Sequence, residues 1–248
     1  WPASIGESEK IALRHAIDYV EAIINADVSR VDGIEKNPVR VRALLRSLSR
    51  NISTLATIRT IHDDIAMGDA DESISEKTIS QYLGALDRIF VTENLPAWNP
   101  ALRSKTAIRT SPKRQFVDPS IAAAVMRLTP SRLLEDFNYF GFLFESLCDR
   151  DLRIYAEAID GQVFHYRDGS GLEADAVIAL NDGRWAAVEV KLGSKEIEDA
   201  AVHLLELKNK VNTEKMREPS FLMILTGTEI AYRREDGVYV VPLGCLKD

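Results

Sequence analysis

The sequence has few of the residues on which several protein classes depend. Only Cys148 and Cys245 are cysteine among its 248 residues, and there is no CxxC pair or Cys/His cluster. This argues against a disulfide framework or a cysteine zinc site, and we interpret both as reduced thiols. No uncharged apolar run reaches the roughly 18 residues that suggest a membrane helix. No secretory signal opens the chain, so we expect a cytoplasmic protein without a membrane partner.

The sequence also lacks an initiator methionine and a phosphate-binding loop. It begins with Trp1-Pro2, and we therefore expect it to be part of a longer chain. No G-x-x-x-x-G-K-[ST] pattern is present, so we do not expect these residues to bind or hydrolyse ATP by that mechanism. The 46% hydrophobic and 28% charged content is that of a globular protein, with length for one large domain or two small ones.

Negative charge is in excess, but it is unevenly distributed. The formal net charge is -7, yet residues 36–115 contain 13 basic and 8 acidic side chains, an excess of five positive charges. Two stretches, 36–62 and 94–115, have no acidic residue. A basic segment in an acidic protein predicts a surface that faces a polyanion, although such runs are more often only a solvated face.

The first half of the chain is predicted to be helical, because its apolar residues recur with helical periodicity. Helices are expected at 7–25, at 39–50, from Ser53 or Thr54 to Met67, and from Ser75 to about Ile89. A strand-like segment at 113–118 follows. Helices before a β pair are the order of a winged helix, which commonly docks its second helix in the DNA major groove. We therefore divide this half into an N-terminal helical segment, 1–35, and a winged-helix-like module, 36–118.

The helix from Ser75 to about Ile89 is the second of a helix-turn-helix candidate. Candidate nucleic-acid contacts lie on it and in the basic stretch after it: Lys77, Gln81, Arg88, Arg103 and Lys105. The exposed face of that helix is mixed in charge rather than strongly basic. Nucleic acid, with DNA first, is the expected partner. A packing module, a protein partner or a homo-oligomer is the alternative.

Residues 119–248 predict a domain of mixed α/β or α+β class, in which a sheet is flanked by helices. Two β-prone runs flank Asn181-Asp182-Gly183, a strong hairpin signal because these residues tolerate positive φ. The other elements expected are helices at 131–150 and 196–211, and strands at 153–158, 162–167, 221–226, 229–233 and 238–242.

Charged residues gather at one end of the predicted hairpin. Glu173 and Asp175 share a face of one arm, and Glu189 and Lys191 share a face of the other, because alternate side chains on a strand point the same way. Glu145 lies within the apolar surface of the helix at 131–150, an expensive place for a carboxylate unless it is paired or bound to metal. The simpler interpretations are a solvated ion pair on the sheet and a glutamate at the helix margin.

Two carboxylates on adjacent strands and a lysine two positions from one of them suit phosphoryl chemistry. Oxygen ligands without cysteine or a histidine pair favour Mg²⁺ or Mn²⁺ over zinc. Such an ion contacts a phosphate and activates water, while a lysine stabilises the developing negative charge. Asp175, Glu189 and Lys191 meet these requirements.

This arrangement resembles the PD-(D/E)XK phosphodiesterase superfamily. More narrowly, the chain resembles the C-terminal region of bacterial and archaeal AAA-type ATPases that carry domain of unknown function 4143. The likeness rests on Trp1-Pro2, Thr78 to Leu83, Leu95 to Trp98, Phe116 to Asp118, Gly141 to Glu145, Glu173 to Asp175, Val188 to Lys191, and Val241 to Leu243.

The resemblance implies a restriction-endonuclease-like sheet with Asp175, Glu189, Lys191 and Glu145 as catalytic residues. Asp175, Glu189 and Glu145 would hold the metal. It also implies an ATPase module, with its ATP, before Trp1. The expected function is Mg²⁺-dependent hydrolysis of nucleic-acid phosphodiesters by residues 119–248. The alternative is a catalytically inactive nucleic-acid or protein-binding module that couples the ATPase to a target.

Binding of duplex DNA by the basic segment predicts a marked dependence on salt. When a protein neutralises several phosphates, its affinity falls steeply as counterions become more concentrated. Titration of labelled duplex DNA with the whole chain at increasing salt concentration should show this fall. An affinity that stays constant with salt would contradict phosphate contacts.

Overall fold

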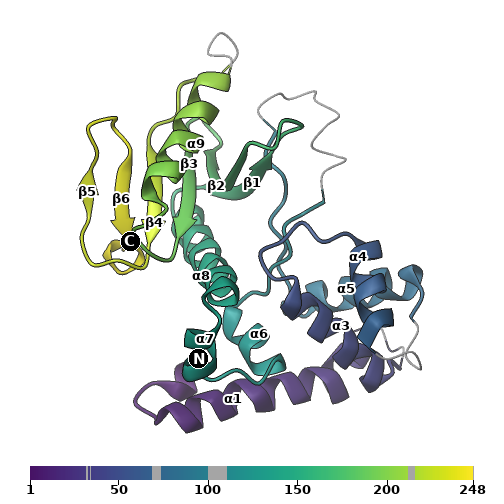
Figure 1. Cartoon of the computed structure of the whole chain (residues 1–248). Helices are drawn as coiled ribbons and strands as arrows, with labels where there is room; N and C mark the ends of the chain where they lie inside the picture. The colour runs from purple at the N-terminus through teal and green to yellow at the C-terminus, as the bar shows by residue number, and fades with distance from the viewer. Residues whose placement is uncertain (32, 34, 69–73, 100–110, 212–215, 248) are drawn as a thin grey trace. The chain divides into compact units, whose positions relative to one another are not determined.

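A computed structural model of the chain describes residues 1–31, 33, 35–68, 74–99, 111–211 and 216–247 (Figure 1). The chain divides into two compact units. The first unit contains residues 1–94 and 114–143, and the second contains residues 95–113 and 144–248. The predicted domains, bounded at residues 35 and 118, are each one continuous stretch of sequence. The two units are each made of two stretches that alternate along the chain.

The interleaving follows from the contacts of two connecting segments. In the second unit, the segment before Lys113 pairs with the first strand: the main-chain N–H of Trp98 donates to the carbonyl of His165, and His165 N–H donates to Pro96. In the first unit, Ile121, Ala122 and Leu143 belong to the apolar core of the N-terminal helices. Each segment therefore joins the unit that satisfies its backbone or buries its apolar side chains.

The first unit is helical in its described residues. Its elements are η1 (Pro2–Ser4), α1 (Glu9–Ala22), the π-helical turn η2 (Ile23–Asp27), α2 (Val28–Arg30), α3 (Pro38–Arg50), α4 (Ile58–Gly68), α5 (Glu76–Arg88), α6 (Pro119–Val125) and α7 (Pro130–Glu135). The predicted start of α5 is confirmed, because the Ser75 hydroxyl accepts a hydrogen bond from the Thr78 N–H.

Two predictions for this half of the chain are wrong. Neither Ser53 nor Thr54 caps α4, which begins at Ile58. Ser53 instead has a positive φ of 57°, and its N–H donates to the carbonyl of Arg114. The strand expected at 113–118 is also absent, since the described residues there form only isolated bridges, Thr92 with Phe116 and Leu95 with Lys113. The helices of the expected winged helix are present, but no two-stranded wing lies in the described part of the chain.

The second unit is built on a six-stranded mixed sheet in the order β1-β2-β3-β4-β6-β5. The strands β1 (Gly161–Arg167), β2 (Glu173–Leu180) and β3 (Trp185–Lys191) are antiparallel neighbours. The strands β4 (Leu222–Thr226) and β6 (Tyr239–Pro242) continue the sheet parallel to β3, and β5 (Tyr232–Arg233) pairs antiparallel with β6. The expected mixed α+β class, helical first and then a sheet, is confirmed.

Helices cover both faces of this sheet. α9 (Ile197–Lys210) packs Ala200 and Leu204 against one face, with Val177 and Ala187 of the sheet. In Figure 1 it lies beside β3. α8 (Phe137–Glu157) packs Phe144 and Cys148 against the other face. The short η5 (Leu243–Cys245) follows β6. Among the described helices, none combines the length and apolarity needed to cross a bilayer.

The predicted hairpin is confirmed: β2 and β3 flank Asn181-Asp182-Gly183, and Gly183 has a positive φ of 84°. The strand predicted at 153–158 is wrong, because α8 continues to Glu157. Its buried residues Cys148, Leu152 and Ala156 recur every four positions, so tertiary packing extends the helix through the β-prone Ile154 and Tyr155.

Gly227 is expected to be required where the chain leaves β4. A Cβ at this position would lie 2.8 Å from the main-chain oxygen of Leu192, whereas a Cβ at Gly193 would meet nothing within 4 Å. We expect Gly227→Ala to lower the free energy of unfolding by about 1–3 kcal/mol, because backbone must shift to accommodate the methyl group. Urea unfolding followed by tryptophan fluorescence measures this, with Gly193→Ala as the control. Equal loss of stability in the two variants would contradict the close approach.

Candidate functional site

The register of β2 and β3 places Asp175 opposite Glu189. The main-chain ladder ends at the pair Ala176 and Val188, one position earlier. Beyond it, Asp175 Oδ2 accepts a hydrogen bond from the N–H of Val190 at 2.8 Å. On the other side of β2, the pairs Phe164–Val177 and Tyr166–Ala174 leave one more residue on β2 than on β1. This irregularity includes Asp175, and such a bulge redirects a side chain, here toward β3.

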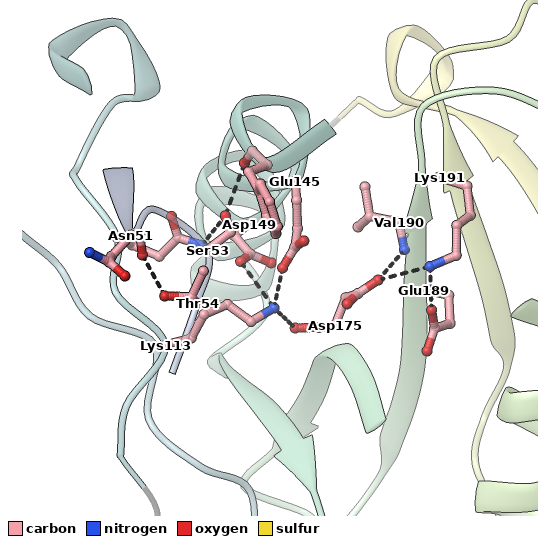
Figure 2. Close-up of polar contacts among 12 residues, drawn as sticks. Asn51, Ser53, Thr54, Lys113, Glu145, Asp149, Asp175, Glu189, Val190 and Lys191 are labelled. Carbon is pink, nitrogen blue, oxygen red and sulfur yellow. Dashed lines mark hydrogen bonds and ion pairs between the residues drawn. The ribbon is translucent and has the colours of Figure 1, made fainter. Parts of the chain in front are cut away.

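Lys191 joins the two carboxylates (Figure 2). Its Nζ atom lies 2.8 Å from Glu189 Oε2 and 3.6 Å from Asp175 Oδ2. The Asp175 and Glu189 carboxyl groups also influence each other's pKa. The structure therefore brings Asp175, Glu189 and Lys191 together at adjacent strand ends.

Glu145 of α8 lies on the other side of Asp175, where a second lysine holds it. The Nζ atom of Lys113 is 2.5 Å from Glu145 Oε1, 2.7 Å from the main-chain oxygen of Asp175 and 3.8 Å from Asp149 Oδ2 (Figure 2). In the sequence, Lys113 is notable only as one of the basic residues of the stretch 94–115. No local pattern identifies its role, because Glu145 and Asp175 are 32 and 62 positions away.

Burial and neighbouring charge give these groups unusual proton affinities. Burial, followed by repulsion from Asp175, raises the pKa of Glu189 to about 8. Burial likewise raises the pKa of Glu145 to about 8, although Lys113 opposes it. Burial would also raise the pKa of Asp175, but Lys113, Lys191 and the Val190 N–H outweigh it and lower that pKa. Burial disfavours the Lys191 ammonium, yet its two carboxylate partners raise its pKa, so it is charged at neutral pH.

A polar cleft of about 470 Å³ opens beside the strand ends. Asp175, Glu189 and Lys191 line it, as do the turn at 170–172 and the α9 side chains of His203 and Glu206. Glu173 lines it too, with its carboxylate 3.1 Å from Arg167 Nη1. Glu145 is not among its described lining residues. A second cavity, of about 320 Å³, is lined mainly by apolar residues such as Leu152, Phe221 and Met223, and it has no such charged cluster.

The donor set fits a magnesium ion with few protein ligands. In the ranges that the structure describes, no group of three or more His, Cys, Asp or Glu side chains is arranged to hold a metal ion. Asp175 and Glu189 supply two carboxylates, and Mg²⁺ commonly takes one or two from a protein while keeping waters or contacting phosphate. These two residues would therefore hold Mg²⁺ or Mn²⁺. Glu145 is instead paired with Lys113.

The candidate nucleic-acid residues are only partly covered by the structure. Lys77, Gln81 and Arg88 are exposed side chains of α5. Arg88 also donates a hydrogen bond from Nε to the carbonyl of Gly84 at 3.1 Å. Arg103 and Lys105 lie outside the described residues. Their role in binding nucleic acid stays a prediction.

Comparison with known proteins gives two family matches. Residues 1–132 match the family model described as domain of unknown function DUF8612. Residues 140–246 match the model described as domain of unknown function DUF4143, so the expected likeness to that domain is confirmed over this range. The second match contains Glu145, Asp175, Glu189 and Lys191, whereas Lys113 falls in the first. No curated protein matches the chain.

The raised pKa of Glu189 predicts that this residue destabilises the metal-free protein at alkaline pH. A group whose pKa is higher in the folded state contributes stability below its unfolded pKa, near 4.5, and that contribution is lost as pH rises through about 8. Glu189→Gln cannot ionise. Its stability relative to wild type should therefore increase from pH 5 to pH 8.5, by up to about 1.4 kcal/mol per pH unit.

Urea unfolding in the presence of a chelator, at several pH values, measures this difference. Glu196→Gln, at an exposed position just before α9, is the control for removal of a carboxylate that is not buried. A difference between Glu189→Gln and wild type that does not change with pH would contradict the electrostatic explanation.

Proposed function

The chain belongs to the family of domain of unknown function DUF8612, and we propose that its second unit is a metal-dependent phosphodiesterase that acts on nucleic acid. This proposal rests on one observation: Asp175, Glu189 and Lys191 contact one another and line the same polar cleft. Burial and the neighbouring Asp175 raise the pKa of Glu189 to about 8, so without an ion this carboxyl holds a proton at neutral pH that a bound cation can displace. A divalent cation is the ligand that suits this arrangement.

The residues of the cleft have separable roles in this proposal. Asp175 and Glu189 hold Mg²⁺ or Mn²⁺, and the hydrogen bond from Val190 N–H orients the Asp175 carboxylate. When bound, the ion would polarise a phosphate oxygen and lower the pKa of a coordinated water. Lys191, which is fully protonated at neutral pH, stabilises negative charge that develops on the phosphate.

Several features support nucleic acid as the substrate class. The mixed sheet presents an aspartate on one strand and Glu-x-Lys on the next, the order found in the PD-(D/E)XK superfamily. Helices α3 to α5 are the three helices expected for the winged-helix-like module, and α5 exposes Lys77, Gln81 and Arg88. In this proposal the first unit binds DNA, and an AAA-type ATPase acts on the same target.

Replacement of the cleft residues should abolish metal-dependent cleavage. We expect Asp175→Asn to reduce hydrolysis of labelled DNA or RNA by at least about 100-fold, because it removes a metal ligand. Lys191→Met should reduce cleavage on a similar scale while retaining metal binding, because it removes charge stabilisation only. Gel assays with and without Mg²⁺ or Mn²⁺ measure cleavage, and metal-induced thermal stabilisation measures binding. Glu196→Gln is the control.

The possible outcomes separate catalysis from simple binding. Cleavage that persists unchanged in Asp175→Asn would show that these residues do not catalyse it. A wild-type chain whose melting temperature does not respond to either ion would favour a catalytically inactive binding module.

A further inference from the structure

The ammonium group of Lys113 lies in a pocket of oxygen atoms. Its contacts are Glu145 Oε1 at 2.5 Å, the carbonyl oxygen of Asp175 at 2.7 Å and Asp149 Oδ2 at 3.8 Å. The Lys113 side chain is only 7% exposed and Asp149 is fully buried. Two carboxylates and a carbonyl are the kind of oxygen donors that a hard divalent cation takes.

Asp175 connects this pocket with the cleft. Its carbonyl faces Lys113, while its carboxylate contacts Lys191 and Val190 (Figure 2). Cations on the two sides of one residue are close enough for their charges to interact, and both lysines act on the charge of Asp175. A divalent ion in the cleft therefore has a fixed positive charge nearby on the side of Glu145.

We propose that Lys113 is a positioning residue that takes the place of a second metal ion: it fills the oxygen pocket of Glu145, Asp149 and the Asp175 carbonyl, and so restricts the site to one divalent ion. The single ion is the one held by Asp175 and Glu189, so this inference rests on the proposed function. Glu145 then acts through Lys113 and does not contact the metal.

This role explains why the four carboxylates form two pairs with different surroundings. Glu145 and Asp149 contact the ammonium of Lys113, whereas Asp175 and Glu189 face the cleft. A lysine fixed to the chain neutralises the first group without exchange with solvent. A bound ion would dissociate. Lys113 also donates a hydrogen bond to the main-chain carbonyl of Asp175, and so links β2 to Glu145 of α8.

Metal stoichiometry tests the inference. Titration of the whole chain with Mn²⁺, with free ion counted by electron paramagnetic resonance, should give one ion per wild-type chain. Lys113→Ala opens the oxygen pocket and should bind two. Lys113→Ala combined with Glu145→Gln should return to one, because the second site loses a carboxylate. Lys195→Ala, at an exposed position, is the matched control and should bind one.

A second measurement covers the case in which Lys113→Ala folds poorly without metal. Thermal unfolding followed by circular dichroism should then show a larger stabilisation by Mn²⁺ for Lys113→Ala than for wild type, because two ions bind the folded state.

Different outcomes remove different proposals. Two ions on the wild-type chain, or one on Lys113→Ala with no extra stabilisation by Mn²⁺, would overturn the role of Lys113 and leave the proposed function standing. A wild-type chain that binds no Mn²⁺ would overturn both.

Discussion

The polar centre of the second unit depends on Asp175, which lies where β2 and β3 stop pairing through their main chains. Its carboxylate accepts the N–H of Val190 in place of a ladder hydrogen bond, and its carbonyl accepts the ammonium of Lys113. One residue thereby ends the hairpin ladder, orients a carboxylate toward Lys191 and links β2 to the pair of Lys113 and Glu145. Loss of any of these contacts would leave a polar group buried without its partner, which is costly.

The surrounding packing makes this concentration of charge possible. Apolar clusters on both faces of the sheet, under α8 and α9, fix the strands that carry the charged side chains. Glu189 is only 4% exposed, and it shares its ammonium partner with Asp175. A buried carboxylate pair of this kind does not serve stability, because apolar residues would pack there at lower cost. Such local conflict with the rules of folding is typical of functional sites.

Sequence patterns predicted the sheet better than its surroundings. The hairpin was predictable, since alternation and the Asn181-Asp182-Gly183 turn are local signals, and the site residues Asp175, Glu189 and Lys191 lie on it. The strand expected at 153–158 failed because β propensity there competes with burial of Leu152 and Ala156 along α8. The strand expected at 113–118 failed because Lys113 bonds to Leu95, whereas Arg114 bonds to Ser53 and Thr54, in different units.

The sequence by itself determined the class of the fold, the hairpin and the identity of three charged residues at its end, because strand periodicity and turn chemistry act over a few positions. Only the tertiary structure decided what those charges contact. Lys113 and Glu145 are far apart in sequence, and His203 and Glu206 line the cleft from a helix that showed no chemical pattern. Ion pairing depends on distance in space, so the partner of a buried charge follows from how the chain returns on itself, which no local pattern records.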